Sequence, residues 1–463
     1  MATLAPLLRA RKISSMELVQ TVLSRIERLN PRLNCFITVL QDQARKEAAS
    51  ADRALARGDW RGPLHGIPVA IKDNIWTREV RTTAGSKILA DFIPQEDASV
   101  VAALRRAGAV VLGKTNLHEF AYGVTCANAH FGAVHNPWDI KRIPGGSSGG
   151  SAAALAAGLC VAAMGTDTGG SIRIPAAMCG VVGLKPTFGR VSCYGVIPLA
   201  RSLDHAGPLA RSAADAAILL KVVAGHDPRD PSSARNPLEN FVSAVRKPLG
   251  RVRIGWPRDF FFDRVADDVR SSVEAARRVF ESLGAQFIEV LLPHVGESLR
   301  PATEIALAEA AQFHRAAGFF PARAAEYSQE VRARLETGSK IAASNYLDAL
   351  EARTALQQEF NAALKNVTAI FAPTVPVGAP KIGEESIVID GEAEDVRTAL
   401  VRLNRPSNLT GLPAISLPCG FTAEGMPIGL QIIGRALDEA HLLQLGAAYQ
   451  HRTDWHTRRP PLV

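Results

Sequence analysis

From Pro144 to Arg190 the chain reads PGGSSGGSAAALAAGLCVAAMGTDTGGSIRIPAAMCGVVGLKPTFGR, in which glycine is dense and Ser and Thr recur. Residues 151–157 predict an Ala-rich helix that Gly158 ends, and residues 160–164 predict a buried strand. The turn at 168–171 is Thr-Gly-Gly-Ser. Successive glycines let backbone N–H groups point at one place, as an oxyanion hole requires, and the final Ser could attack a carbonyl held there. A closely packed turn without a chemical role is the alternative that this stretch alone leaves open.

Strands and helices also alternate on the N-terminal side of this stretch. Ser14 to Glu17 form a helix-capping box, and residues 67–71 are an apolar run of strand length. Asp97 is placed to cap a helix that ends at Gly108, and residues 109–112 predict the next buried strand. The order strand, helix, strand predicts an α/β fold in which neighbouring strands are parallel and covered by helices.

The C-terminal half predicts a helical elaboration and then a return to the sheet. Its polar, Pro-rich segment DPRDPSSARNP is the best candidate for a boundary. The elements expected beyond it are strands at 252–255 and 287–292 around a helix at about 263–283, helices over most of 299–366, strands at 369–371, 414–417 and 428–433, and a closing helix from about 438. We therefore expect one domain over 1–463, with a core at about 60–215, a helical elaboration at about 226–365, and strands and a helix at about 366–463 that rejoin the core sheet.

Composition excludes several classes of protein. The chain is 47% hydrophobic and 21% charged, which excludes disorder for most of it. Its longest apolar stretch, residues 152–164, is shorter than the roughly 20 residues that a membrane span needs. The net charge is +8, but no three positive residues are consecutive, so nucleic acid is not favoured as a partner. The N-terminus does not resemble a secretory signal and the six cysteines lack CxxC spacing, so a cytoplasmic protein with free thiols is expected.

Two short motifs match known patterns but lack the context that those patterns need. Residues 108–115 fit the phosphate-loop pattern GxxxxGK[ST], yet the four variable positions, Ala-Val-Val-Leu, are themselves the expected buried strand. Residues 145–149 fit the nucleophile elbow GxSxG, yet the preceding segment 136–144 is too polar and Pro-broken for a central strand. No His or Cys spacing typical of a metal site occurs, and no metal or cofactor is expected.

A serine nucleophile needs a base, and Lys72 is a candidate. It ends the apolar run 69–71 and is therefore expected to be buried. To accept a proton near neutral pH, its pKa must fall by roughly 3 units from about 10.4, which corresponds to about 4 kcal/mol and is within the reach of burial. A solvated lysine at a strand end is the common alternative, and the residues alone do not decide between the two.

Three segments together resemble the amidase signature family. They are Gly66-Ile67-Pro68-Val69-Ala70-Ile71-Lys72-Asp73-Asn74, then GGSSGGS at 145–151, then GTDTGGS at 165–171. Ser147 follows Lys72 by 75 residues and precedes Ser171 by 24, which is also similar to the family. Further similar segments are 113–120, 408–414 and 427–431. The resemblance spans most of the chain and is weakest over about 226–365.

The resemblance implies both a fold and a site. The implied fold is α/β, with a central mixed, twisted β-sheet covered by helices on both faces. The implied triad has Ser171 as nucleophile, Ser147 as a bridging serine in a cis peptide, and Lys72 as base. The implied oxyanion donors are the N–H groups of Thr168, Gly169, Gly170 and Ser171. Supporting or substrate-binding roles fall to Ser148, Asp167, Arg173, Glu119 and Tyr122.

Family members include free-standing amidases and the A-subunit of glutamyl-tRNA(Gln) amidotransferase. The amidotransferase pattern has an acidic residue near the later strands, where this chain has Arg405, so a free-standing amidase acting on a small-molecule amide is favoured. Arg334 could bind a carboxylate, although a surface helix arginine is the simpler interpretation. A homodimer is compatible with the sequence. A catalytically silent scaffold is the alternative from another class, and retention of all three triad residues argues against it.

Overall fold

Three buried parallel strands form the half of the sheet that carries the motifs. In the computed structural model, which describes residues 1–462, β2 (Pro68–Lys72) pairs in parallel with β3 (Val110–Thr115) on one side and with β6 (Ala162–Asp167) on the other. Every residue of these strands is buried. Because strands covered on both faces are apolar throughout, all three were predictable as strands from the sequence.

These strands belong to one large mixed sheet. Its 11 strands are, in spatial order, β1 (Phe36–Val39), β3, β2, β6, β8 (His205–Ala210), β7 (Val182–Lys185), β14 (Ala414–Phe421), β15 (Pro427–Gly434), β11 (Ala369–Pro373), β9 (Arg253–Pro257) and β10 (Gln286–Val290). Between β6 and β11 each successive pair of strands is antiparallel, whereas β11 pairs in parallel with β9, and β9 with β10. The expected mixed sheet is confirmed.

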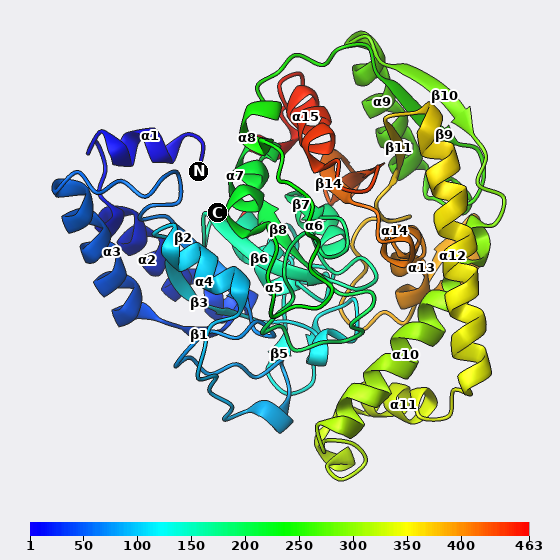
Figure 1. Cartoon of the computed structure of the whole chain (residues 1–463), viewed down its shortest axis with the longest axis horizontal. Coiled ribbons are helices and arrows are strands. Elements are labelled where there is room, and N and C mark those ends of the chain that lie inside the picture. Colours follow the sequence, from blue (N-terminus) through cyan, green and yellow to red (C-terminus); the bar gives the residue numbers. More distant parts are fainter. Residues whose placement is uncertain (463) are drawn as a thin grey trace.

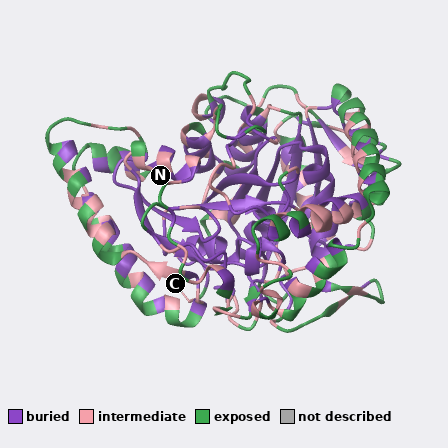
Figure 2. Cartoon of the chain, turned by 60° about the horizontal axis from the view of Figure 1, so that its bottom comes forward, coloured by how far each residue is buried: buried purple, intermediate pink, exposed green. Residues whose placement is uncertain are grey.

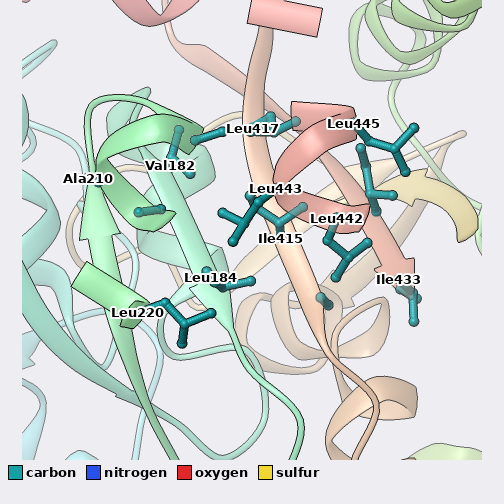
Figure 3. Close-up of a cluster of buried hydrophobic side chains, with 14 of the residues drawn as sticks. Val182, Leu184, Ala210, Leu220, Ile415, Leu417, Ile433, Leu442, Leu443 and Leu445 are labelled. Carbon is teal, nitrogen blue, oxygen red and sulfur yellow. The ribbon is translucent and has the colours of Figure 1, made fainter. Parts of the chain in front are cut away.

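Helices cover both faces of the sheet, as expected (Figure 1). One face is covered by α4 (Ser99–Arg106), α7 (Ala213–Val223), α9 (Asp267–Ser282) and α15 (Glu439–Gln450), and the other by α2 (Ser15–Leu33), α3 (Gln41–Ala56), α5 (Gly149–Ala156) and α6 (Arg173–Cys179). Successive side chains of β2 point to opposite faces of the sheet. Val69 and Ile71 belong to the hydrophobic core on the first face, and Ala70 belongs to the core on the second. Figure 3 shows part of the first core, where side chains from β7, β8, β14 and β15 meet those of α7 and α15.

A helical layer lies beside the C-terminal half of the sheet. It consists of α10 (Leu299–Ala316), α11 (Gln329–Gly338) and α12 (Ala343–Asn366) at one side of the molecule, where α10 packs on both α11 and α12 (Figure 1). The outer helices present exposed residues, whereas the sheet is buried (Figure 2). The hairpin of β12 (Ser386–Ile389) and β13 (Glu392–Asp395) leads into α13 (Val396–Arg402) and α14 (Arg405–Thr410).

The remaining elements are short. They are α1 (Leu4–Arg9), α8 (Phe241–Ala244), the hairpin of β4 (Ala127–Asn128) and β5 (Gly132–Ala133), and single 3-10 turns at Lys87–Leu89, Glu119–Ala121, Val295–Ser298, Ala324–Glu326 and Trp455–Thr457. No helix among residues 1–462 is long and apolar enough to cross a membrane.

The sheet is continuous across the candidate boundary. The strands β14, β15 and β11 from the C-terminal part lie between β7 of the core and β9, and the region of about 226–365 adds β9 and β10 at the edge. The polar segment 227–237 lies against the core, where Ala234 N–H donates to Gly189 O at 2.8 Å. The division into a single domain stays a prediction, and the continuity of the sheet supports it.

The local predictions have mixed outcomes. The capping box is confirmed, because Ser14 Oγ accepts from Glu17 N–H while the Glu17 carboxylate accepts from Ser14 N–H. The cap expected at Asp97 is wrong. The helix begins at Ser99 after Ala98, and Asp97 instead accepts hydrogen bonds from Arg78 N–H and from Arg105. The Asp97 carboxylate thus joins the loop at Arg78 to a side chain of the last turn of α4 and does not cap the helix.

The phosphate-loop string at 108–115 forms no phosphate loop. Its residues 110–115 are the buried strand β3, as expected. The Lys114 side chain is buried. Its ammonium group donates to Ile75 O and Thr82 Oγ1 and lies 3.6 Å from a carboxylate oxygen of Asp73. The lysine is therefore a core residue with an internal partner.

Candidate active site

Lys72 lies buried at the C-terminal end of β2. Its Nζ donates to Ser147 Oγ and to Thr166 Oγ1, each at 2.7 Å, and the side chain is 0% exposed. Because β2 and β6 are parallel neighbours, their carboxyl ends lie side by side, which brings Lys72 and Thr166 together. Burial lowers the pKa of Lys72 to about 7. A large share of the molecules therefore carry a neutral amine at neutral pH, as a general base requires.

Ser147 belongs to a turn that is joined to the end of β6. The Gly146–Ser147 peptide is cis, as the resemblance implied. The adjacent Ser148 donates from its Oγ to Thr166 O at 3.1 Å and from its N–H to Ser171 O at 3.1 Å. The turn, the lysine and the 168–171 loop therefore form one hydrogen-bonded unit.

The Asp167 carboxylate organises the loop that follows β6. It accepts from Gly170 N–H at 2.8 Å and from Ile172 N–H at 3.1 Å. Gly170 has φ +118°, and a Cβ there would lie 2.6 Å from Ile174 Cδ1, so the tight turn requires glycine. This loop differs from the expectation in one respect: the Gly170 N–H is already bonded to Asp167 and is not free for an oxyanion.

Three N–H groups of the loop remain available. Within residues 1–462, the backbone N–H groups of Thr168, Gly169 and Ser171 make no hydrogen bond, and these same three residues line a cavity. We therefore narrow the candidate oxyanion hole from four donors to three. Thr168 Oγ1 donates to Asp204 at 2.5 Å, which ties this loop to the segment before β8.

Arg173 is a fully buried arginine that forms an ion pair with Asp167. Its Nε and Nη2 donate to the two carboxylate oxygens at 3.0 and 2.9 Å. Burial alone would raise the pKa of Asp167, but the Arg173 charge and hydrogen bonds hold it well below its usual range. Arg173 also donates to Ser407 and Gln431, which joins the loop to α14 and β15. Neither Asp167 nor Arg173 is among the residues that line the cavity, and the supporting role that the resemblance implies for them stays a prediction.

Replacing Arg173 with methionine is expected to lower the free energy of unfolding by about 3–5 kcal/mol, because the Asp167 carboxylate would be left buried without its partner. A urea titration followed by circular dichroism measures the change. Arg332→Met is the matched control, since Arg332 forms an exposed pair with Glu336 at 3.7 Å, and its loss is expected to cost less than about 1 kcal/mol. Equal effects of the two substitutions would contradict the role given to Arg173.

Ser171 lines a small cavity of about 40 Å³. The cavity wall is made by the loop 168–171, the segment 121–124, the helices α10, α13 and α14, and Leu199. Tyr122 is in this wall, as expected of a substrate-binding residue. Glu119 is not, because its carboxylate accepts from Ser86 Oγ and from Ser328 N–H and lies 2.9 Å from His130 Nε2. Arg334 is engaged too, with Tyr122 O and with Glu330.

The sequence reasoning missed four residues of the site. Thr166 stands inside the quoted motif GTDTGGS and Asn408 inside the segment 408–414, but nothing local marked them as partners of Lys72 and Asp167. Asp204 carries no motif, and burial raises its pKa to about 6. Arg397 reaches the cavity from α13, some 226 residues along the chain from Ser171. No sequence pattern indicates such a contact.

Comparison with known proteins gives consistent matches over the whole chain. The family model for Amidase matches residues 17–443. The glutamyl-tRNA(Gln) amidotransferase A-subunit of Hahella chejuensis is 46% identical, with 98% of this chain and 97% of that protein covered. A chain from a vestigial protein complex related to the origins of an s-triazine catabolic enzyme is 34% identical and superposes with a TM-score of 0.93, over 97% of this chain and 98% of that one.

A solved A-subunit of the amidotransferase from Thermotoga maritima is 37% identical, with a TM-score of 0.79 over 96% of this chain and 95% of that one. The sequence identity of each of these relatives is higher than a shared fold alone would give. The family model also spans nearly all of the chain. The resemblance stated from the motifs is confirmed: this chain belongs to the amidase family, as an amidase signature protein.

Proposed function

We propose that this chain hydrolyses a small carboxylic amide to its acid and ammonia or an amine through an acyl-enzyme on Ser171. The observation that carries the proposal is the 2.7 Å contact between the buried Lys72 Nζ and Ser147 Oγ, next to the loop that presents Ser171 to a cavity. A base, a hydroxyl relay, a nucleophile and free N–H donors are the parts that acyl transfer needs.

In the first half-reaction, neutral Lys72 accepts the proton of Ser147 Oγ, and Ser147 takes the proton of Ser171. Ser171 Oγ attacks the amide carbonyl carbon, and the N–H groups of Thr168, Gly169 and Ser171 stabilise the negative oxygen. The carbon–nitrogen bond then breaks, and Ser147 returns a proton to the leaving amine while Lys72 reprotonates Ser147. Water repeats the sequence on the ester and releases the acid.

A second candidate is the glutaminase component of a glutamyl-tRNA(Gln) amidotransferase. The 46% identity to such a component over 98% of this chain favours it. Two observations favour the free-standing amidase: Arg397 and Arg405 line the cavity, and no acidic residue that could bind the ammonium of glutamine is among the residues that line it. Both candidates use the same triad, so the substrate and the need for partner subunits distinguish them.

The purified chain alone is expected to release ammonia from at least one small amide without added metal, ATP or tRNA. The assay is a coupled measurement of ammonia over a panel of aliphatic, aryl and dicarboxylic amides and glutamine. Ammonia from glutamine only after partner subunits are added would overturn the free-standing assignment and support the second candidate. No turnover of any amide under either condition would support a silent scaffold.

A further inference from the structure

Two arginine side chains share the wall of the Ser171 cavity. Arg397 comes from α13 and Arg405 from the start of α14. Arg405 is only 8% exposed, and a Cβ placed on Gly169 would lie 3.7 Å from its Nε. One guanidinium therefore lies directly beside the loop that holds the candidate oxyanion donors.

These two arginines have no carboxylate partner. Among residues 1–462, no Asp or Glu oxygen lies within 4.0 Å of either guanidinium; Arg405 donates only to the neutral groups Leu299 O and Thr303 Oγ1. Burial, and then the charge of Arg397, lower the pKa of Arg405 to about 9, so it still carries its charge at neutral pH. A buried guanidinium without a counter-ion is unfavourable, which indicates that an anion from outside completes the site.

The Tyr122 hydroxyl adds a third unused donor. Tyr122 is 2% exposed, and its hydroxyl has no hydrogen-bond partner among residues 1–462. The Arg397 guanidinium carbon lies 5.9 Å from the centre of its ring. Burial raises the pKa of Tyr122 to about 12, so the hydroxyl keeps its proton and can donate. Two cations and a neutral donor with no acidic residue in the wall are suited to a carboxylate and unsuited to an ammonium group.

We infer that the substrate is a short amide whose acyl chain ends in a carboxylate and bears no ammonium group, with that carboxylate bound by Arg397, Arg405 and the Tyr122 hydroxyl. This inference rests on the proposed amidase function and specifies its substrate class. The small cavity and the closeness of Arg405 to Gly169 place the carboxylate near the reacting carbonyl. Malonamate and succinamate are short amides of this class, whereas glutamine would bring its ammonium group against two guanidinium groups.

Binding can be tested without turnover. In the Ser171→Ala variant, isothermal titration calorimetry is expected to detect binding of succinamate, and to find butyramide, which has the same chain length, bound roughly 10- to 100-fold more weakly, because the neutral amide has no carboxylate for the charge-assisted contact. Binding of succinamate by this variant, together with no amide turnover by the unsubstituted enzyme, would uphold the anion site and overturn the amidase. Turnover of neutral amides by the unsubstituted enzyme, together with equal binding of succinamate and butyramide, would overturn the inference and leave the amidase standing.

Kinetics on the active enzyme provide the second test. The ratio of kcat/KM for succinamate to that for butyramide is expected to exceed roughly tenfold, and to fall by roughly 10- to 100-fold in Arg397→Gln and in Arg405→Gln. Two variants are used because the loss of the buried Arg405 side chain could unfold the protein. Arg397 is less buried than Arg405, so its replacement disturbs the fold less. The matched control is Arg300→Gln on the outer side of α10, with a 76% exposed side chain, where the ratio should not change. An unchanged ratio in both cavity variants would overturn the inference.

Discussion

Replacing Ser171 with alanine is expected to lower kcat/KM by roughly 10⁴-fold or more while the protein stays folded. In the proposed mechanism the Ser171 hydroxyl oxygen forms the acyl-enzyme, and without it neither Ser147 nor Lys72 has an oxygen to activate. The substitution removes one oxygen at a position that lines the cavity, so the hydrophobic core is not changed. Ammonia release measures the rate, and thermal unfolding checks the fold.

The matched control is Ser151→Ala in the same Gly- and Ser-rich motif. Ser151 Oγ lies 2.7 Å from Thr115 Oγ1 and donates to Met164 O at 3.2 Å, which are contacts between a helix and strands. Its loss should reduce stability by about 1 kcal/mol and change the rate by less than about tenfold. A fully active Ser171→Ala protein would remove Ser171 as the nucleophile, and a Ser151→Ala protein with equal loss of rate would show that the assay reports folding.

Replacing Lys72 with methionine is expected to reduce kcat by roughly 10²- to 10⁴-fold, which is the range for loss of a positioned general base. Methionine keeps most of the volume but cannot accept the proton of Ser147.

The dependence of the rate on pH tests the role of Lys72 a second time. Because burial holds the pKa of Lys72 at about 7, lowering the pH below about 7 protonates the base, and the rate should fall about tenfold per pH unit.

Lys114→Met controls for the loss of a buried ammonium. Lys114 is also 0% exposed, and burial lowers its pKa to about 8, but its partners are Asp73 and backbone or hydroxyl oxygens away from the cavity. The folded fraction of this variant should keep the rate of the parent within about tenfold, with a lower stability. A parent rate that does not change between about pH 7 and about pH 5 would contradict the assignment of Lys72 as base.

The sequence predicted the parts of the fold that have strong local patterns. The runs that became β2, β3 and β6 are apolar throughout, and so they were recognisable as buried strands. In contrast, β8 has the sequence HAGPLA, and its Pro and Gly hide a central strand that is held by its neighbours β6 and β7 rather than by its own propensity. The hairpin of β12 and β13 was not predicted either, because each strand has only four residues and the second, EAED, is polar.

The candidate site also has residues that a local sequence pattern marks and residues that only the packing of distant segments brings there. Lys72, Ser147 and Ser171 stand in motifs whose spacing was visible in the sequence. The walls of the cavity come from α10, α13 and α14, whose positions depend on how distant segments pack. Gly170 illustrates a finer limit: a glycine in a donor-rich loop suggested a fourth oxyanion donor, and only the position of the Asp167 carboxylate excluded it. The family resemblance of the motifs indicates the candidate reacting groups, whereas the hydrogen bond that each backbone N–H makes depends on its neighbours in space.

The most direct test of the account is to find where the acyl group is attached during turnover. The enzyme is mixed with an amide that it hydrolyses, quenched in acid within the first turnover, and digested for peptide mass spectrometry. The peptide that contains Ser171 is expected to gain the mass of the acyl group and to lose it on treatment with hydroxylamine, which cleaves esters. An acyl group on any other residue, or turnover with Ser171 unmodified at every quench time, would contradict the assignment of Ser171 as nucleophile.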